Sequence, residues 1–298
     1  MKAMVSERQL AWTLGVPLAR LRGIAGNARA HYREWKTCDK IKGKVRTICS
    51  PDDELKAIQR NINKRIIGVD GVGPDVHGGV RHRSPKTNAG QHIGCRILVT
   101  LDVRSFFPSV RHEMVFRMLR ECGCGTGVAR LLTKLTTLHG ALPQGAPTSV
   151  PIANLLLARP VDQPTGAQAR ASAASYTRFV DDIGMSGDRP QTMINDVARR
   201  LSVRGLKTYR GRRDEKLKIQ PHSRPQEITG ILINSGRPTL ARRHRDKVRA
   251  AIHDVAKIAN PAERDEALRS IRGRLAHVKR FHPGVARRLE AHLSRILG

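Results

Sequence analysis

Three aspartates stand at the ends of apolar segments, where their carboxylates could act together. Asp102 closes the alternating segment RILVTLDV, and Asp181 and Asp182 separate YTRFV from IGMSG. These patterns predict a core strand that ends in a carboxylate and a hairpin with a two-residue acidic tip. Converging carboxylates repel one another unless divalent cations bind, and two Mg²⁺ ions about 4 Å apart suit phosphoryl transfer onto a polynucleotide end. Either motif alone could instead consist of turn and capping residues.

The net charge indicates a polyanionic partner. The 298 residues include 55 Lys and Arg against 25 Asp and Glu, which gives a formal net charge of +30. Such an excess repels itself unless a polyanion neutralises it, so the composition indicates nucleic acid or an anionic membrane surface as the partner. Aromatic residues make up only 3% of the chain, so we expect contacts to phosphates rather than stacking on bases.

Other features of the sequence argue against a membrane or secreted protein. The apolar stretches are far shorter than the roughly 20 residues of a spanning helix, and the N-terminal residues contain no apolar signal region. The five cysteines are odd in number and lack CxxC spacing, which favours reduced thiols over disulfides or a zinc site. We therefore expect a cytoplasmic protein.

The elements before Asp102 follow from periodicity and turn residues. Residues 6–24 predict an amphipathic helix that is kinked or split at Pro17, and residues 31–46 predict a basic strand pair. A second amphipathic helix is expected after Pro51. The glycine-rich segment 68–79 fits no phosphate-binding motif, and we interpret it as a flexible connector.

The elements after Asp102 alternate between helices and strands. Two amphipathic helices should follow the SFFPS turn, and residues 142–158 should form a loop that becomes an apolar helix from about Ser149. Residues 164–175 are interpreted as a low-complexity linker, and residues 228–233 as a strand. The tail from Leu240 predicts three basic amphipathic helices.

In their order along the chain, these segments resemble the motifs of reverse transcriptases. LDVRSFFPSV resembles motif A, LPQGAPTSVPIANL motif B and YTRFVDDIGMS motif C. KGKVRTICSPDDELKAIQ resembles the fingers segment, while KLKI and ITGILIN resemble motifs D and E. NAGQH at 88–92 and ITG at 228–230 are similar to the NAxxH and VTG elements of bacterial retron reverse transcriptases.

The resemblance implies an α+β fold, the right-hand polymerase arrangement of fingers, antiparallel-sheet palm and small helical thumb. Residues 1–95 would form an N-terminal helix and the fingers. Residues 96–234 would form the catalytic palm, and residues 235–298 an RNA-binding helical thumb. One departure lies in motif C, where Phe179 and Val180 replace the usual Tyr-Ala; Val180 would narrow the space over the primer end.

The resemblance also implies a role for each residue of the catalytic centre. Asp102, Asp181 and Asp182 would bind two Mg²⁺ ions together with the carbonyl of Val103. Lys216 would protonate the departing pyrophosphate. Residues implied to bind the incoming dNTP are Lys44, Arg46, Phe107, Gln144 and Gly145, with Phe107 as the steric gate against a ribonucleotide 2′-OH. Residues implied to bind RNA are Asn88, His92, Thr229, Gly230, Arg242, Arg243, Arg245 and Lys247.

The function implied is that of a retron-type reverse transcriptase, an RNA-directed DNA polymerase that makes single-stranded DNA (msDNA) from dNTPs. Its template and primer would be a cognate structured noncoding RNA, with priming from an internal guanosine 2′-OH. A role in antiphage defence with an effector protein would follow. The alternatives are another bacterial reverse transcriptase class, such as a group II intron-like or other defence enzyme, and a catalytically silent RNA-binding scaffold.

Overall fold

The computed structural model describes residues 1–38, 45–68, 72–209 and 216–297. Lys44, which was predicted to bind the nucleotide, lies outside the described residues. Helices and antiparallel sheets together form a mixed fold, as expected from the sequence. Within the described ranges, no helix is both long and apolar enough to cross a bilayer.

The predicted N-terminal helix is split in two near Pro17, as expected. Helix α1 spans Glu7–Leu14 and α2 spans Leu18–Gly26. Ser6 caps α1 because its side chain accepts a hydrogen bond from a backbone N–H of the first turn. Gly15 ends α1 with a φ of +69°, a left-handed conformation that glycine adopts readily.

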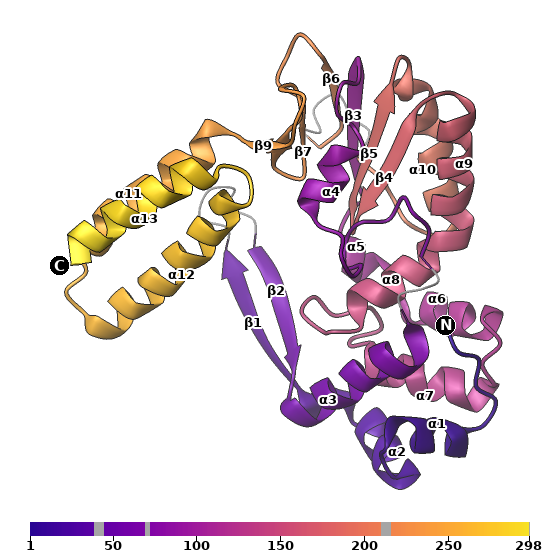
Figure 1. Ribbon diagram of the computed structural model, residues 1–298. Coiled ribbons are helices and arrows are strands. Elements are labelled where there is room, and N and C mark those ends of the chain that lie inside the picture. The colour runs from indigo at the N-terminus through magenta and orange to yellow at the C-terminus, as the bar shows by residue number, and fades with distance from the viewer. Residues whose placement is uncertain (39–44, 69–71, 210–215, 298) are drawn as a thin grey trace.

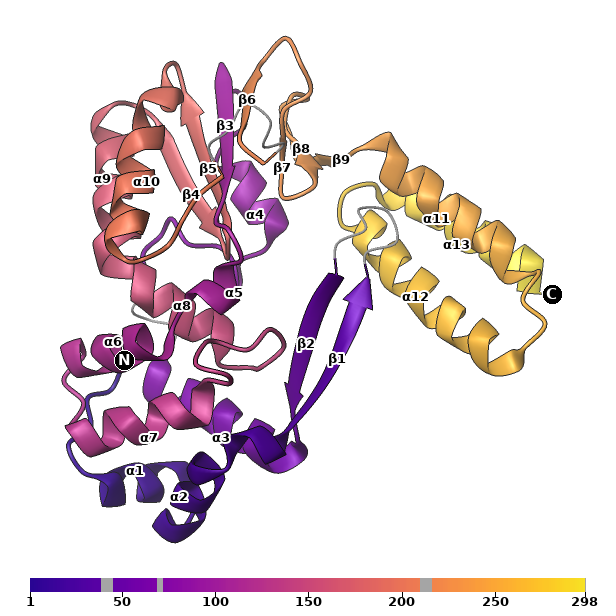
Figure 2. The ribbon, with the colours of Figure 1, turned by 180° about the vertical axis from the view of Figure 1, so that it is seen from behind.

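A strand pair is present as predicted and forms a hairpin that projects from the N-terminal helices, but its second strand extends beyond the predicted residues 31–46 to Pro51. Strand β1 (Tyr32–Cys38) follows the short helix η1 (Ala28–His31) and pairs antiparallel with β2 (Val45–Pro51). The chain then enters α3 (Asp53–Ile62), which continues as the π-helical turn η2 (Asn63–Ile67). Figures 1 and 2 show the hairpin extending away from α3 toward the C-terminal helices.

A four-stranded antiparallel sheet, ordered β4-β5-β3-β6 and called the central sheet below, contains the strands that carry the predicted aspartates. Its strands are β3 (Ile97–Asp102), β4 (Ser175–Phe179), β5 (Asp182–Gly187) and β6 (Lys218–Pro221). Both strands predicted to carry carboxylates are therefore present, and they are direct neighbours. Pairing of β3 with β5 brings the aspartates of the two strands to the same end of the sheet.

The turn of the β4–β5 hairpin differs by one residue from the prediction. Its two residues are Val180 and Asp181, whereas Asp182 is already the first residue of β5. Val180 has a φ of +61°, which is unusual for a β-branched residue. Asp181 therefore lies in the turn, whereas Asp182 lies on the paired strand β5.

Helices cover one face of the central sheet and connect it to the N-terminal helices. The interpretation of residues 164–175 as a linker was wrong, because most of this segment forms a helix whose Thr165, Gly166 and Ala169 are buried. Alanine and glutamine are good helix formers, so packing suffices to order this segment. The helices of this region are α5 (Phe106–Ser109), α6 (His112–Glu121), α7 (Thr126–Thr136), α8 (Ser149–Leu157), η3 (Ala158–Asp162), α9 (Gln163–Ala171), η4 (Pro190–Met193) and α10 (Ile194–Val203).

The opposite face of the sheet carries α4 (Pro85–Gly90) and a second small sheet. Residues 228–233, predicted as one strand, instead form a tight hairpin of β7 (Glu227–Ile228) and β8 (Ile231–Leu232), to which β9 (Thr239–Leu240) adds. The turn residues Thr229 and Gly230 both have positive φ, the combination that two-residue hairpin turns require.

The predicted C-terminal helices form a three-helix bundle. They are α11 (Arg242–Val255), α12 (Pro261–Lys279) and α13 (Pro283–Leu297), and Figure 1 shows them apart from the central sheet. Their apolar side chains form one continuous core with the second small sheet and with Leu98 of β3. The neighbouring residues Val99 and Leu101 point into the larger core on the helical face. Strand β3 is thus buried between two cores.

The glycine-rich connector is held against the central sheet, at least over residues 72–79. Val76 forms a parallel bridge with Arg178 of β4 and is fully buried. Arg83 Nη1 donates to the carbonyls of Gly73, at 2.8 Å, and of Pro74 and Val76. This part of the segment is therefore ordered along the edge of the sheet at β4, and we call it the ordered border segment. Its glycine content alone indicated a flexible connector.

Candidate active site

The three predicted aspartates lie at one end of the central sheet. In the register of β3 with β5, Asp102 is directly opposite Asp182. The amide of Val103 donates to the carbonyl of Asp181 at 3.1 Å, which joins the hairpin turn to the end of β3. Asp102 and Asp181 both line the same cleft. Residues almost 80 positions apart in the sequence are therefore neighbours.

The two carboxylate oxygens of Asp102 have different surroundings. Oδ2 lies 2.5 Å from Nζ of Lys216, which also stands 4.4 Å from the ring centroid of Tyr209. Oδ1 is buried and accepts no hydrogen bond from the described residues. A buried carboxylate oxygen without a donor is costly, and a cation is the natural partner for it.

The donor set suits a hard divalent cation. Carboxylates and a backbone carbonyl are the oxygen ligands that Mg²⁺ prefers, and Oδ1 of Asp102 offers an unsatisfied acceptor. In the parts of the chain that the structure describes, no three His, Cys, Asp or Glu side chains are gathered into a complete metal-binding group. Lys216 instead provides positive charge at Asp102. The residues fit a cation, although their side chains are not closed around one.

The cleft beside Asp102 and Asp181 has a volume of about 640 Å³. Phe107 and Gln144 line it, as does Arg46 of β2, so three of the residues predicted to bind nucleotide are gathered here. Phe106 and Phe107 both line the cleft, but Phe106 is only 3% exposed and belongs to the core, whereas Phe107 is partly buried. The role of Phe107 as a steric gate stays a prediction.

Gly145 allows a close approach between two parts of the chain. The amide of Cys49 in β2 donates to the carbonyl of Gln144 at 2.8 Å. A Cβ at Gly145 would lie 3.0 Å from the carbonyl oxygen of Cys49, and the φ of Gly145 is +121°. Gly145 was predicted to contact the incoming nucleotide, but in the structure its close neighbour is strand β2 of the β1–β2 hairpin.

Sequence reasoning did not find Glu34 and His139, which also line the cleft. Oε1 of Glu34 on β1 lies 2.8 Å from Nε2 of His139, and this contact bridges the hairpin to the loop before the motif B segment. The pair is separated by 105 residues, and neither residue belongs to a recognisable local pattern.

Asn88 and His92 are not on a surface that RNA could reach. Each is 1% exposed, so the prediction that their side chains bind RNA conflicts with their burial. The ring nitrogens of His92 lie 2.7 Å from the hydroxyls of Thr177 on β4 and Ser186 on β5. Burial lowers the pKa of His92 to about 3, so the ring is neutral and connects the two strands of the β4–β5 hairpin.

The other residues predicted to bind RNA occupy the second small sheet and the bundle. Thr229 and Gly230 form the turn between β7 and β8. Arg243 pairs with Glu227 and so connects α11 to β7. Arg242 and Arg245 line a groove of about 620 Å³ between α11 and α13, together with Arg249, Arg288 and His292. Lys247 is exposed on α11, away from the residues that line this groove.

A buried ion pair behind the catalytic hairpin was also missed. Arg178 of β4 is 0% exposed and forms two hydrogen bonds with Asp162, of 2.9 and 2.8 Å. The hydroxyl of Tyr176 donates to the same carboxylate at 2.7 Å, and burial raises the pKa of this hydroxyl well above its usual value. The one signal in the sequence was a charged residue inside a strand whose residues are mostly buried.

Comparisons with known proteins agree with this arrangement. Residues 36–222 match the family described as reverse transcriptase (RNA-dependent DNA polymerase). The Mx65 retron reverse transcriptase of Myxococcus xanthus is 34% identical, over 95% of this chain and 70% of the relative. The Mx162 retron reverse transcriptase of the same organism is 31% identical, over 98% and 67%. The Ec86 retron reverse transcriptase of Escherichia coli is 28% identical, over 85% and 77%.

The matched region includes Asp102, Asp181, Asp182 and every residue that lines the cleft except Glu34. The similarity to the retron enzymes extends beyond it in both directions, because it covers nearly the whole chain. The chain therefore belongs to the reverse transcriptases, in the group of the retron enzymes, and is an RNA-directed DNA polymerase.

Proposed function

We propose that this enzyme copies a cognate structured noncoding RNA into single-stranded DNA, starting from the 2′-OH of an internal guanosine in that RNA. The observation that carries the proposal is the juxtaposition of Asp102 with Asp182 and with the backbone of Asp181 at a cleft of nucleotide size. A role in antiphage defence with a separate effector is part of the proposal, supported by the relationship to retron enzymes.

In this proposal the molecule has the right-hand arrangement of a polymerase. Residues 1–95, with the β1–β2 hairpin, are the fingers, residues 96–234 are the palm, and residues 235–298 are the thumb. Support comes from the hairpin and the bundle, which stand on the same side of the central sheet (Figure 2).

Asp102, Asp181 and Asp182 would hold two Mg²⁺ ions, with the carbonyl of Val103 as a further ligand. Bound in this way, divalent cations lower the pKa of an attacking hydroxyl and stabilise a leaving pyrophosphate. The unsatisfied Oδ1 of Asp102 and its position opposite Asp182 support this assignment.

The protein's own side chains would select and orient the incoming dNTP. The exposed Arg46 would contact the triphosphate, because guanidinium forms paired hydrogen bonds with phosphate oxygens. The Phe107 ring would clash with a ribose 2′-OH. The ammonium of Lys216, already within hydrogen-bonding distance of Asp102, would donate a proton to the departing pyrophosphate.

The RNA would be held by the bundle. Arg242 and Arg245 lie at a groove with few acidic groups, in which Asp246 is the one acidic residue among the described lining residues. Phosphate contacts of this kind supply affinity and orientation, while base contacts supply specificity. The turn at Thr229 and Gly230 belongs to the sheet that connects the bundle to the central sheet, and we propose it as a second RNA contact.

The test is to express the gene with its upstream flanking DNA and to search purified nucleic acid for a small branched RNA–DNA species. The control is the double variant Asp181→Ala, Asp182→Ala. A branched product that is absent from the control would support the proposal. If the enzyme extends a DNA primer on an ordinary RNA template but gives no branched product, the proposed priming is refuted while polymerase activity stands.

A further inference from the structure

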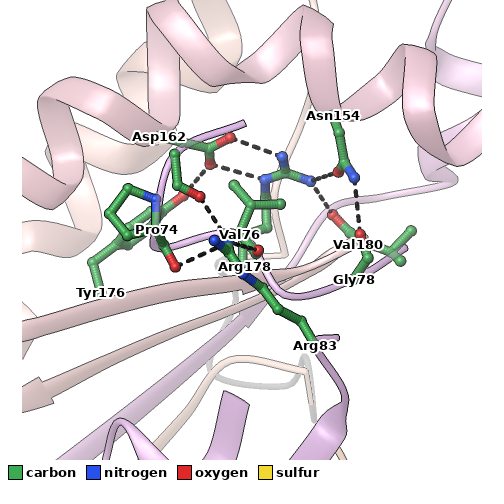
Figure 3. Close-up of polar contacts among 10 residues, drawn as sticks. Pro74, Val76, Gly78, Arg83, Asn154, Asp162, Tyr176, Arg178 and Val180 are labelled. Carbon is green, nitrogen blue, oxygen red and sulfur yellow. Dashed lines mark hydrogen bonds and ion pairs between the residues drawn. The ribbon is translucent and has the colours of Figure 1, made fainter. Parts of the chain in front are cut away.

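The guanidinium of the buried Arg178 reaches the turn that carries the catalytic aspartates. Its Nε and Nη2 are bound to Asp162, as described above, while Nη1 donates to Oδ1 of Asn154 at 3.0 Å and to the carbonyl of Val180 at 2.9 Å. Figure 3 shows the guanidinium enclosed between Asp162 on one side and Asn154 with Val180 on the other. The hydrogen bonds of the guanidinium thus connect η3 and α8 to the turn between β4 and β5.

Val180 is held from a second direction by the ordered border segment. A Cβ at Gly78 would lie 2.4 Å from the amide nitrogen of Val180 and 2.7 Å from its Cγ2. Gly78 is fixed in turn, because Asn154 Nδ2 donates to its carbonyl at 2.8 Å. The backbone of Val180 is therefore confined between the Arg178 guanidinium and the Gly78 backbone.

This confinement matters because Val180 adopts a left-handed conformation that a β-branched residue rarely takes. Such a conformation persists only where the surroundings impose it. Val180 immediately precedes Asp181, whose carbonyl accepts the Val103 amide, and Asp182 follows opposite Asp102. A rotation of the Val180 peptide would therefore move both aspartates relative to Asp102.

We propose that Arg178 and Gly78 are positioning residues that set the affinity of the active site for divalent cations. Neither touches the substrate, and both act through the backbone of Val180. This inference rests on the proposed function, because it takes Asp102, Asp181 and Asp182 as the metal ligands. In this inference, two residues outside the cleft determine how tightly the cleft binds divalent cations.

The first test compares Gly78→Ala with Gly73→Ala in the full-length enzyme bound to a primed RNA template. The added methyl group at Gly78 would meet Val180, whereas a Cβ at Gly73 has no neighbour within 4 Å. We expect Gly78→Ala to weaken Mn²⁺ binding, followed by electron paramagnetic resonance, at least fivefold. The Mg²⁺ concentration for half-maximal extension should rise by the same factor, while KM for dNTP at saturating Mg²⁺ changes less than twofold.

The second test approaches the turn from the other side with Arg178→Lys. Lysine keeps a positive charge beside Asp162 but cannot reach Asp162, Asn154 and Val180 together. Its matched control is Tyr176→Phe, which removes one hydrogen bond from the same buried cluster and leaves the Arg178–Val180 contact in place. We expect Arg178→Lys to weaken Mn²⁺ binding and to raise the Mg²⁺ concentration for half-maximal extension, as for Gly78→Ala. Tyr176→Phe should only lower the melting temperature.

The outcomes separate this inference from the proposed function. If wild-type enzyme shows no metal-dependent extension, the proposed function itself fails. If wild type is active and folded Gly78→Ala binds Mn²⁺ as tightly as Gly73→Ala, the positioning role is overturned. Should Arg178→Lys fail to fold, the comparison at Gly78 still decides, because it leaves the ion pair intact.

Discussion

Acid should weaken this fold through His92, the buried ring that connects β4 to β5. Its pKa is lowered from 6.5 to about 3, chiefly by burial and further by the nearby His77. Because the folded-state pKa is depressed, the contribution of the neutral ring is fully present above pH 6.5 and is lost as pH falls toward 3. Each pH unit in this window costs about 1.4 kcal/mol, so His92 alone should remove about 2 kcal/mol from the free energy of unfolding by pH 5.

The assay is urea denaturation of wild type and His92→Gln at pH 8 and pH 5, with His253→Gln as a matched control at an exposed site. Other groups also titrate in this range, so the informative quantity is the difference between proteins. Wild type should lose about 2 kcal/mol more than His92→Gln between the two pH values, and His253→Gln should follow wild type. Equal losses for wild type and His92→Gln would refute the argument from burial.

Three further predictions concern the cleft and the bundle. Phe107→Ala should increase the preference for ribonucleotides, measured as the ratio of kcat/KM for rNTP to that for dNTP, by roughly 10- to 200-fold, and an unchanged ratio would exclude Phe107 as the gate. Arg46→Ala should raise KM for dNTP by about tenfold or more, because a hydrogen bond to a charged group contributes about 1.5–3 kcal/mol, while template affinity stays constant; a KM within twofold of wild type would contradict this. Replacing both Arg242 and Arg245 by Gln should reduce the slope of log K for RNA against log salt by about 1.4–1.8, and an unaltered slope would remove these residues from the phosphate contacts.

Local sequence patterns predicted the secondary structure correctly where a strict alternation or a proline determined it. The strict alternation before Asp102 predicted β3, and helix α8 begins at Ser149 as expected, with Pro151 in its first turn. Pro17 splits the first helix because a proline cannot continue a hydrogen-bonded turn. At these positions the tertiary structure agrees with what the backbone prefers locally.

The errors arose where distant contacts decide. Residues 164–171 looked like a linker because their composition is simple, yet α9 packs against β4. His92 was assigned to RNA by resemblance, but its partners Thr177 and Ser186 are 85 and 94 residues away. Arg178 and Asp162 face each other only because β4 folds back beneath η3. The partners of His92 lie outside any local window of sequence, whereas Asp162 and Arg178 are 16 residues apart and meet through the packing of α9 against β4.

Strand β3, buried between two cores, makes the bundle and the catalytic end of the sheet one cooperative unit. Leu98 belongs to the core that also contains Ile252 of α11 and Leu275 of α12, while Leu101 belongs to the core that contains Leu132 of α7. Detaching the bundle together with the second small sheet would therefore expose the back of the strand that carries Asp102. Its amides should exchange with solvent hydrogen only in the largest opening events, and an RNA that holds the bundle closed also protects the strand on which the chemistry depends.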